Sequence, residues 1–343
     1  MPVPSLNEVA QKLVLPGMGI LAADESEGTI AKRFAVIGLP VTLETRRDYR
    51  EMLFRSREAM SKYISGVILT EETLLQNAAD GTPFVTLLAE TDVLPGIKVD
   101  RGAFAMPGTQ GEKITEGLDG LRARLAHYRE VGAKFAKWRG VIAVSDIAPS
   151  RNGIRANAHV LARYAALCQE AGIVPVVEPE VLADGEPGDH SLERCAEVTS
   201  ETLETVFKEL RLAGVDLGGM LLKPNMVLPG IRSAERPSVG EVARRTLEVL
   251  KAQVPATVPG IAFLSGGQSD EAATAHLSAM NRMGPLPWAL TFSYGRALQT
   301  AALLAWAGEA ANVPAAQAAF AHRARMNSLA ATGEWRVELD RAA

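Results

Sequence analysis

Eight short apolar segments alternate with segments of helical periodicity along most of this 343-residue chain. Brief apolar runs bounded by glycine, proline or charged residues are typical of buried strands. The expected strands cover 19–26, 66–70, 96–100, 134–139, 173–180, 219–223, 261–267 and 288–296. The expected helices cover 5–15, 43–62, 114–130, 155–171, 191–213, 238–253, 269–282 and 297–307. Strands that alternate with helices predict a parallel sheet, and eight such units predict a closed (β/α)8 TIM barrel of the α/β class.

An open, doubly wound sheet is the alternative fold. No GxGxxG motif follows the first expected strand, which counts against this alternative. The chain also contains no linker and no low-complexity segment, so residues 1–343 are expected to form one domain. The last part of the chain, 314–343, is expected to be a helix followed by a short polar tail.

The sixth expected strand ends on a lysine, within the stretch Gly-Met-Leu-Leu-Lys-Pro-Asn-Met at 219–226. Pro224 stops the strand, so Lys223 lies where a core strand meets a loop. Lysine is rarely placed in a core for packing, because a buried ammonium without a partner is costly. The position of Lys223 therefore indicates either a reactive amine or a lysine held in an ion pair at the barrel mouth.

Charged residues also stand at the ends of other expected strands, where the active sites of closed barrels lie. A spacing of two residues within a strand places both side chains on one face. Charges in this arrangement can form a catalytic cluster or a structural network of ion pairs that caps the barrel. The strand-end charges are Asp24, Lys98, Asp100, Lys137, Arg139, Glu178, Glu180 and Lys223.

Lysines close to carboxylates suit amine catalysis. A free lysine amine has a pKa of about 10.4, whereas a useful nucleophile or base needs about 7–8, and that drop is worth roughly 4 kcal/mol. Burial and a neighbouring cation can supply the drop, and Lys137 is the candidate cation beside Lys223. Such an amine forms a Schiff base with a ketone or aldehyde, and the iminium then stabilises a carbanion on the adjacent carbon.

Two glycine-containing loops after the last two strands are expected to bind phosphate. Ser265 and Gly266 follow the seventh strand and precede a helix, and the eighth strand ends in Ser-Tyr-Gly-Arg at 293–296. Glycine lets the backbone approach an anion, helix N-termini offer free N–H groups, and barrels of this kind often bind phosphate here. Turn glycines alone are more often structural, but Arg296 beside one loop favours an anion site.

The composition argues against several other classes of function. The formal net charge is -4, the pI is near 5.9 and the basic residues are scattered, which argues against nucleic-acid binding. Cys168 and Cys195 lie in apolar helical contexts and are expected to be free thiols, and the five isolated histidines argue against a histidine-based metal site. No apolar run reaches membrane-spanning length, and Glu8 and Lys12 argue against a signal peptide, so a cytoplasmic enzyme is expected.

Several long motifs in this sequence resemble those of class I fructose-bisphosphate aldolases. The motifs keep a consistent order and spacing from about residue 5 to about residue 335. They cover 19–33, 96–100, 135–139, 176–180, 221–226, 263–269 and 288–296. The resemblance implies an enzyme that cleaves fructose 1,6-bisphosphate to dihydroxyacetone phosphate and glyceraldehyde 3-phosphate, catalyses the reverse condensation, and needs neither a metal nor a cofactor.

The resemblance also implies catalytic roles for five residues. Lys223 matches the Schiff-base lysine of the family, and Lys137 matches a lysine that assists its chemistry. Glu178 matches the acid/base that serves carbinolamine dehydration and C–C cleavage. Asp24 matches the carboxylate near the C4 hydroxyl of the substrate, and Glu180 matches a carboxylate that positions these groups.

The remaining matched residues are expected to contact the substrate through its phosphates. One phosphate is expected at Ser265, Gly266, Ser293, Gly295 and Arg296. The other phosphate is expected near Ser26, Thr29 and Lys98. Further contacts with phosphate or substrate are expected from Arg33 and Arg139.

The sequence departs from animal members of the family at its C-terminal end. In those members the C-terminal tail ends with a tyrosine that aids proton exchange on the enamine. In this sequence no tyrosine follows Tyr294. Water or an active-site carboxylate are the candidates for protonating the enamine in this chain. Because family members are often tetramers, a homo-oligomer is expected, with a phosphosugar as its small-molecule ligand.

Two other functions compete with this interpretation. One is a non-catalytic, partner-binding protein built on the same scaffold, which would be expected to lack at least one catalytic group. The other is a lysine-dependent aldolase that acts on a different phosphosugar, such as fructose 1-phosphate. The presence of all the matched catalytic groups counts against the first, and the two expected phosphate sites count against the second.

Overall fold

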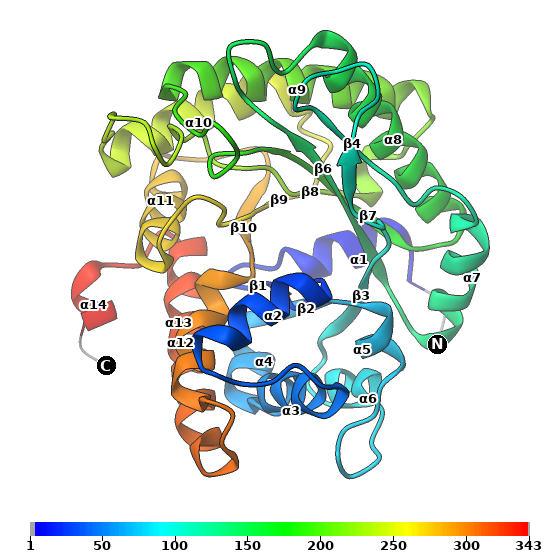
Figure 1. The fold of residues 1–343 in the computed structure, drawn as a ribbon, viewed down its shortest axis with the longest axis vertical. Coiled ribbons are helices and arrows are strands. Elements are labelled where there is room, and N and C mark those ends of the chain that lie inside the picture. Colours follow the sequence, from blue (N-terminus) through cyan, green and yellow to red (C-terminus); the bar gives the residue numbers. More distant parts are fainter. Residues whose placement is uncertain (1–3, 342–343) are drawn as a thin grey trace.

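The computed structural model describes residues 4–341, in which eight parallel strands form a closed barrel (Figure 1). The barrel closes where β10 pairs with β1, with Ser293 opposite Ile20. Its strands, in order around the barrel, are β1 (Gly19–Ala22), β2 (Ile64–Leu69), β3 (Leu94–Lys98), β6 (Phe135–Ile142), β7 (Val174–Val181), β8 (Leu221–Leu222), β9 (Gly260–Phe263) and β10 (Ala289–Tyr294). The predicted (β/α)8 barrel is therefore confirmed, and the open sheet is excluded.

Helices surround this barrel, and α1 packs against its interior (Figure 1). They are α1 (Leu6–Leu13), α2 (Glu27–Val36), α3 (Leu43–Phe54), α4 (Arg57–Tyr63), α5 (Glu71–Leu75), α6 (Phe84–Ala89), α7 (Leu121–Val131), α8 (Arg151–Glu170), α9 (Leu192–Leu212), α10 (Val239–Gln253), α11 (Asp270–Arg282), α12 (Arg296–Trp306), α13 (Val313–Ala331) and α14 (Val337–Arg341). Many of these helices begin after a serine or threonine. Ser150, Ser191, Ser238 and Ser269, for example, each accept a hydrogen bond from a backbone N–H of the first turn, which is the local signal that starts the helix. None of the described helices is both long enough and apolar enough to cross a membrane.

The core has two parts, one inside the barrel and one between the barrel and its helices. The larger cluster packs the outward faces of the strands against the helices. The smaller cluster lies inside the barrel, where α1 contributes Leu13 against inward residues such as Phe135. A Cβ on Gly96 would lie 2.3 Å from the ring of Phe135, so only glycine fits beside this ring. The interior of the barrel toward the amino ends of its strands is thus filled with apolar side chains. Polar side chains can therefore gather at the carboxyl ends of the strands.

Local backbone conformation changes some of the expected boundaries. The expected helix over 43–62 is two helices, because Ser56 has a ψ of 75°, outside the helical region. The expected helix over 114–130 begins only at Leu121, since Gly117 and Gly120 have φ values of 129° and 68°. The start of that segment instead joins a small hairpin of β4 (Ala103–Ala105) and β5 (Lys113–Thr115).

The helix α2 was not expected from the sequence, and it carries several residues of the candidate site. The expected C-terminal helix corresponds to α13, which the short helix α14 follows. Ala342 and Ala343, which belong to the expected polar tail, lie outside the described residues. Cys168 and Cys195 are both buried free thiols, as expected.

Candidate active site

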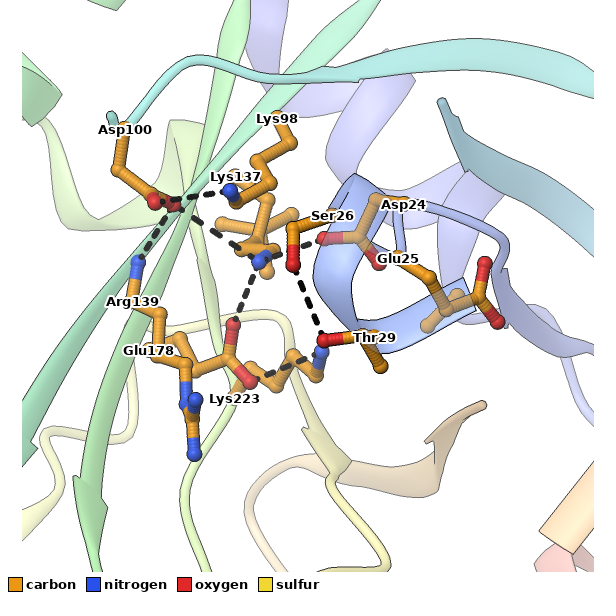
Figure 2. A network of polar contacts seen from close by, with 12 residues as sticks. Asp24, Glu25, Ser26, Thr29, Lys98, Asp100, Lys137, Arg139, Glu178 and Lys223 are labelled. Atoms are coloured by element: carbon orange, nitrogen blue, oxygen red, sulfur yellow. Dashed lines mark hydrogen bonds and ion pairs between the residues drawn. The ribbon is translucent and has the colours of Figure 1, made fainter. Parts of the chain in front are cut away.

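Acidic and basic side chains from five strands converge at the carboxyl end of the barrel (Figure 2). Lys137 and Glu178 lie within the long neighbouring strands β6 and β7, so their backbone positions are fixed by sheet hydrogen bonds. Asp24 and Lys223 follow β1 and β8 at the points where these short strands end. The barrel therefore brings together the four residues that the family resemblance singles out for Schiff-base and acid/base chemistry.

Ion pairs connect these four side chains in one buried series (Figure 2). Lys223 Nζ lies 2.9 Å from Glu178 Oε1, and Lys137 Nζ lies 3.4 Å from Glu178 Oε2. On its other side, Lys137 Nζ lies 2.7 Å from Asp24 Oδ2. The Lys137, Glu178 and Lys223 side chains are at most 5% exposed and the Asp24 side chain is 12% exposed. The network of ion pairs expected at the barrel mouth is present, and it occupies the same place as the expected catalytic cluster.

The two oxygens of Glu178 have different surroundings. Oε1 contacts the Lys223 amine at 2.9 Å, whereas Oε2 is buried without a hydrogen-bond partner among the described residues. The contact between Oε2 and Lys137 at 3.4 Å is thus an attraction between charges rather than a hydrogen bond. One oxygen of Glu178 is therefore placed to exchange a proton with Lys223, and the other retains capacity to accept a proton from a bound molecule.

The charges around this network set the protonation states at neutral pH. Burial lowers the pKa of Lys137, but the surrounding carboxylates, with Asp24 foremost, outweigh burial and hold that pKa above its usual value. For Asp24, burial raises the pKa, but Lys137 and Lys223 outweigh it and hold the pKa below its usual range. The same balance lowers the pKa of Glu178, where Lys223 and Lys137 overcome burial. Both carboxylates are thus ionised in the free protein and can act as bases.

Two charged side chains beside this network form a separate pair. Arg139 Nε donates a hydrogen bond to Glu180 Oε2. Burial would lower the pKa of Arg139, but the Glu180 carboxylate outweighs burial and raises this pKa. A Cβ on Gly266 would lie 2.9 Å from Glu180 Oε1, so the loop after β9 passes directly over this carboxylate. Glu180 and Arg139 thus lie between the network of ion pairs and the loop of Gly266, although they make no ion pair with Lys223.

The expected phosphate-binding residues after β9 and β10 also lie at this end of the barrel. The backbone at Gly295 passes close to β1, because a Cβ there would lie 3.3 Å from the carbonyl oxygen of Ala22. Ser293 is buried in β10, and its Oγ has no hydrogen-bond partner among the described residues. Ser265 is also buried, two residues after the end of β9.

Two arginines expected to contact phosphate border one cavity between α2 and α12. This cavity has a volume of about 570 Å³, and its lining includes Thr29, Arg33, Asp184 and Arg296. Arg296 Nη2 lies 3.3 Å from Asp184 Oδ2, while Arg33 pairs with Glu25 and lies beside Gly295. Both guanidinium groups therefore lie near Gly295, and each is paired with a carboxylate.

Ser26 and Thr29 lie at the start of α2, beside Asp24 (Figure 2). Their hydroxyl oxygens are 3.0 Å apart, and the Ser26 side chain caps none of the backbone N–H groups of α2. The N-terminus of this helix therefore retains free donors, which suit an anion. Lys98, the third residue expected near this phosphate, pairs with Asp100 at 3.2 Å.

Two further residues at this end of the barrel have little or no local signal in the sequence. Asp100 is signalled only as one of the strand-end charges, yet its buried carboxylate contacts both Lys98 and Lys137. Glu25 is held by Arg33 and Arg50 and by Gln299, whose Nε2 donates to Glu25 Oε1 at 2.9 Å. These partners come from the three helices α2, α3 and α12. Glu25 therefore attaches the loop that contains Asp24 to the helices outside the barrel.

The end of the described chain packs against the outer helix α13. The Asp340 carboxylate accepts two hydrogen bonds from Arg323, at 2.6 and 2.8 Å, and a third from Trp335 Nε1 at 3.1 Å. Figure 1 shows α14 at the periphery of the molecule, beside α11 and α13. Within the described residues, the C-terminal segment thus contributes no side chain to the network around Lys223.

The side chain of His276 contacts the glycine-containing loop after β9. Its Nδ1 lies 2.6 Å from Gln268 Oε1, and burial lowers the pKa of His276 to about 4 from the ordinary 6.5. Between these two values the unfolded chain binds a proton on this histidine and the folded chain does not, so folding stability falls as pH decreases from about 6.5 to about 4. That loss amounts to about 3 kcal/mol, at about 1.4 kcal/mol per pH unit.

A His276→Gln variant is expected to lack this pH dependence, because glutamine does not titrate. Urea unfolding of both proteins at pH 7 and pH 4 measures the effect. The difference between their unfolding free energies should change by about 3 kcal/mol between the two pH values, in favour of the variant at pH 4. A His127→Gln variant, altered at an exposed histidine, is the control. A difference that stays constant with pH would contradict the prediction.

Comparisons with known proteins show to which family this sequence is similar. The model of the family described as class I fructose-bisphosphate aldolase matches residues 5–343. A probable fructose-bisphosphate aldolase class 1 of Xanthomonas campestris pv. campestris is 52% identical over 337 residues, which cover 98% of this chain and 100% of that protein. Fructose-bisphosphate aldolase C of Rattus norvegicus is 52% identical over 331 residues, which cover 96% of this chain and 90% of that protein.

A solved structure is similar in fold as well as in sequence. Fructose-bisphosphate aldolase from Plasmodium falciparum, in complex with TRAP and a small-molecule inhibitor, superposes on this chain with a TM-score of 0.94. The two proteins are 49% identical, and the match covers 96% of this chain and 95% of the other.

Proposed function

This chain belongs to the class I fructose-bisphosphate aldolase family, and on that premise we propose that it cleaves fructose 1,6-bisphosphate reversibly through a Schiff base on Lys223. The products are dihydroxyacetone phosphate and glyceraldehyde 3-phosphate. The observation that carries the proposal is the buried contact between the Lys223 amine and Glu178, with Lys137 and Asp24 next to them. A nucleophile, a base and a cation thus lie within one connected site.

The first half of the reaction forms the iminium. Glu178 Oε1 takes a proton from Lys223 Nζ, and the free amine attacks the C2 carbonyl of the substrate. One proton then passes from the attacking nitrogen to the former carbonyl oxygen, which gives the neutral carbinolamine. Glu178 then returns the proton to the C2 hydroxyl, which leaves as water while the nitrogen lone pair forms the C=N bond. The nearby ammonium of Lys137 stabilises the negative charge that develops on the carbonyl oxygen during attack.

The second half breaks the carbon–carbon bond. A carboxylate removes the proton of the C4 hydroxyl, the C3–C4 electron pair moves toward the iminium, and the aldehyde product leaves behind an enamine on Lys223. Glu178 is assigned this proton because its Oε2 has no hydrogen-bond partner within residues 4–341, and Asp24 is assigned to orient the hydroxyl. A proton on C3 and a water on C2 then regenerate the amine and release the ketone product. Water or one of these carboxylates supplies the C3 proton.

The phosphates anchor the substrate on either side of Lys223. We assign one phosphate to the loops of Ser265, Gly266, Ser293, Gly295 and Arg296, and the other to Ser26, Thr29 and Lys98. Arg33 and Arg139 are assigned as further contacts, and Glu180 is assigned to hold Arg139 in place. In this assignment Arg296 and Arg33 exchange a carboxylate partner for phosphate when substrate binds.

The biological setting proposed for this enzyme follows from the family. The matched family is described as glycolytic, and we assign the chain to the same kind of sugar-phosphate metabolism. We also propose that residues 1–343 form one catalytic domain, and that the protein works in the cytoplasm as a homo-oligomer. Size-exclusion chromatography with light scattering would test the oligomeric state.

Borohydride trapping tests the proposed chemistry. When the protein is incubated with fructose 1,6-bisphosphate in EDTA and treated with sodium borohydride, the iminium should be reduced to a stable secondary amine. Mass mapping should place that adduct on Lys223, and activity should be lost in step with labelling. Substrate cleavage without any trapped adduct would overturn the Schiff-base proposal. Absence of cleavage altogether would favour a non-catalytic protein on this scaffold.

The substrate preference tests the two phosphate sites. We expect kcat/KM for fructose 1,6-bisphosphate to exceed that for fructose 1-phosphate by roughly 10- to 100-fold, because one charge-assisted contact is worth about 1.5–3 kcal/mol. Steady-state assays of both substrates, with the released aldehyde coupled to a dehydrogenase, measure the ratio. A ratio near unity would show that the second phosphate contributes nothing and would favour an aldolase for a different phosphosugar.

A further inference from the structure

Asp100 is a buried carboxylate at the barrel mouth to which the proposed mechanism assigns no step. It follows β3, and its side chain is 3% exposed. Its Oδ1 accepts the backbone N–H of Gly102 at 3.3 Å, and its Oδ2 accepts the backbone N–H of Arg139 at 3.4 Å. Because both of these donors belong to the main chain, they hold the carboxylate in place independently of the side chains around it.

This fixed carboxylate lies between two lysines. Lys98 of β3 and Lys137 of β6 are directly opposite each other in the register of the two strands. Like charges at opposite positions of neighbouring strands repel one another. Asp100 Oδ1 lies 3.2 Å from Lys98 Nζ, and Oδ2 lies 3.9 Å from Lys137 Nζ (Figure 2). One carboxylate thus compensates the repulsion between both ammonium groups.

The two lysines differ in what else they contact. Lys137 also pairs with Asp24 and Glu178, whereas Asp100 is the only ion-pair partner of Lys98 within residues 4–341. Lys98 also contributes, after Lys137 and Lys223, to the lowered pKa of Asp24. Without Asp100, the Lys98 ammonium would therefore compete with Lys137 for Asp24.

We propose that Asp100 is a positioning residue of this reaction, an inference that rests on the proposed function. Its negative charge keeps Lys98 at the mouth, facing the phosphate, and keeps Lys137 between Asp24 and Glu178. Asp100 does not itself touch the reacting atoms. Its removal would have two consequences, since it would displace Lys137 and would add one uncompensated positive charge beside the catalytic carboxylates.

The variant Asp100→Asn tests this role. Asparagine keeps the size of the side chain and one oxygen acceptor, but it has no charge. The kcat is expected to fall about 10- to 100-fold, the range that misplacement of a catalytic group produces. In the plot of kcat/KM against pH, the fall in activity on the acidic side, called the acidic limb, is expected to move to lower pH. Without the Asp100 charge, the uncompensated positive charge of the lysines favours the ionised forms of Asp24 and Glu178. Asp119→Asn, at an exposed position on the same connection, is the matched control.

The double variant Lys98→Met/Asp100→Asn separates positioning from a general structural effect. It removes both members of the pair, so the repulsion and the extra charge disappear together. Its kcat should recover to that of Lys98→Met alone, and its acidic limb should return to the position in Lys98→Met. If Asp100→Asn alone does not fold, this comparison between the double variant and Lys98→Met carries the test.

Defined outcomes would overturn the inference. Wild-type kcat and an unshifted acidic limb in Asp100→Asn would show that Asp100 has no role. A lower kcat with an unshifted limb, or a double variant well below Lys98→Met, would show a purely structural role. Borohydride trapping on Lys223 of the wild-type protein is measured alongside, because its failure would contradict the proposed function and not the role of Asp100.

Discussion

The variant Lys223→Met is expected to lose cleavage of fructose 1,6-bisphosphate by at least about 10⁴-fold in kcat, the scale seen when a covalent nucleophile is removed. Methionine has a similar length and suits a buried site, but it cannot form an iminium. Without the iminium, the carbanion formed by C–C cleavage has no electron sink. Steady-state assays and borohydride trapping of the purified variant measure the loss, and trapping should disappear with it.

Because Lys223 is paired with Glu178, its replacement can also change the stability of the fold, and a control for stability is needed. Glu178 loses the cation that contributes most to its lowered pKa, so its pKa should rise while Lys137 remains as its partner. The thermal midpoint of the variant therefore has to be recorded, so that a folding defect is not mistaken for lost chemistry. Lys208→Met, which removes an exposed lysine of α9, is the matched control and should retain wild-type activity. Cleavage by Lys223→Met above about 1% of wild type would refute the assignment of the nucleophile.

The variant Glu178→Gln is expected to lower kcat by about 10²- to 10⁴-fold, the usual contribution of a general acid/base. Glutamine can still contact Lys223 and Lys137, so the site should keep its shape. It cannot carry a proton between the amine, the carbinolamine and the C4 hydroxyl. Because the same group is proposed for several steps, the rate of borohydride trapping and the rate of cleavage should both fall.

A comparison of these two rates tests the assignment of Glu178. Single-turnover trapping reports the formation of the iminium, and steady-state cleavage reports the complete cycle. If only cleavage falls, Glu178 serves the C–C bond alone and another group dehydrates the carbinolamine. If neither rate falls by more than a few-fold, Glu178 is a structural partner of Lys223. Glu130→Gln, at an exposed glutamate of α7, controls for the substitution itself.

Much of this site could be predicted because its residues occupy recognisable positions along the chain. Lys223 could be singled out as a candidate because a short apolar run ends on a lysine followed by proline, a pattern that indicates either a reactive amine or an ion-paired lysine. Lys98, Lys137 and Glu178 could be placed at one end of the barrel because parallel strands all point their carboxyl ends the same way. Secondary-structure boundaries were less predictable, as the break at Ser56 and the delayed start of α7 show.

The partners of each charge could not be predicted in the same way. The sequence suggested Lys137 as a cation beside Lys223, and the structure places Glu178 between the two lysines. The importance of Glu25 was also hidden, because Gln299 lies 274 residues away and reaches it only when α12 packs near β1. Such contacts depend on long-range packing for which the local sequence carries no periodic signal.

The sequence by itself determined the barrel and the kind of chemistry at its mouth, because both follow from local patterns. Apolar runs of strand length alternate with helical segments, and the charges at their ends leave few places for an active site other than the carboxyl edge. Only the tertiary structure decided which charges neutralise one another. Asp24, Asp100 and Glu178 surround Lys137 because the closed barrel brings the carboxyl ends of β1, β3 and β7 close to β6, and interactions between charges depend on distances of a few ångströms.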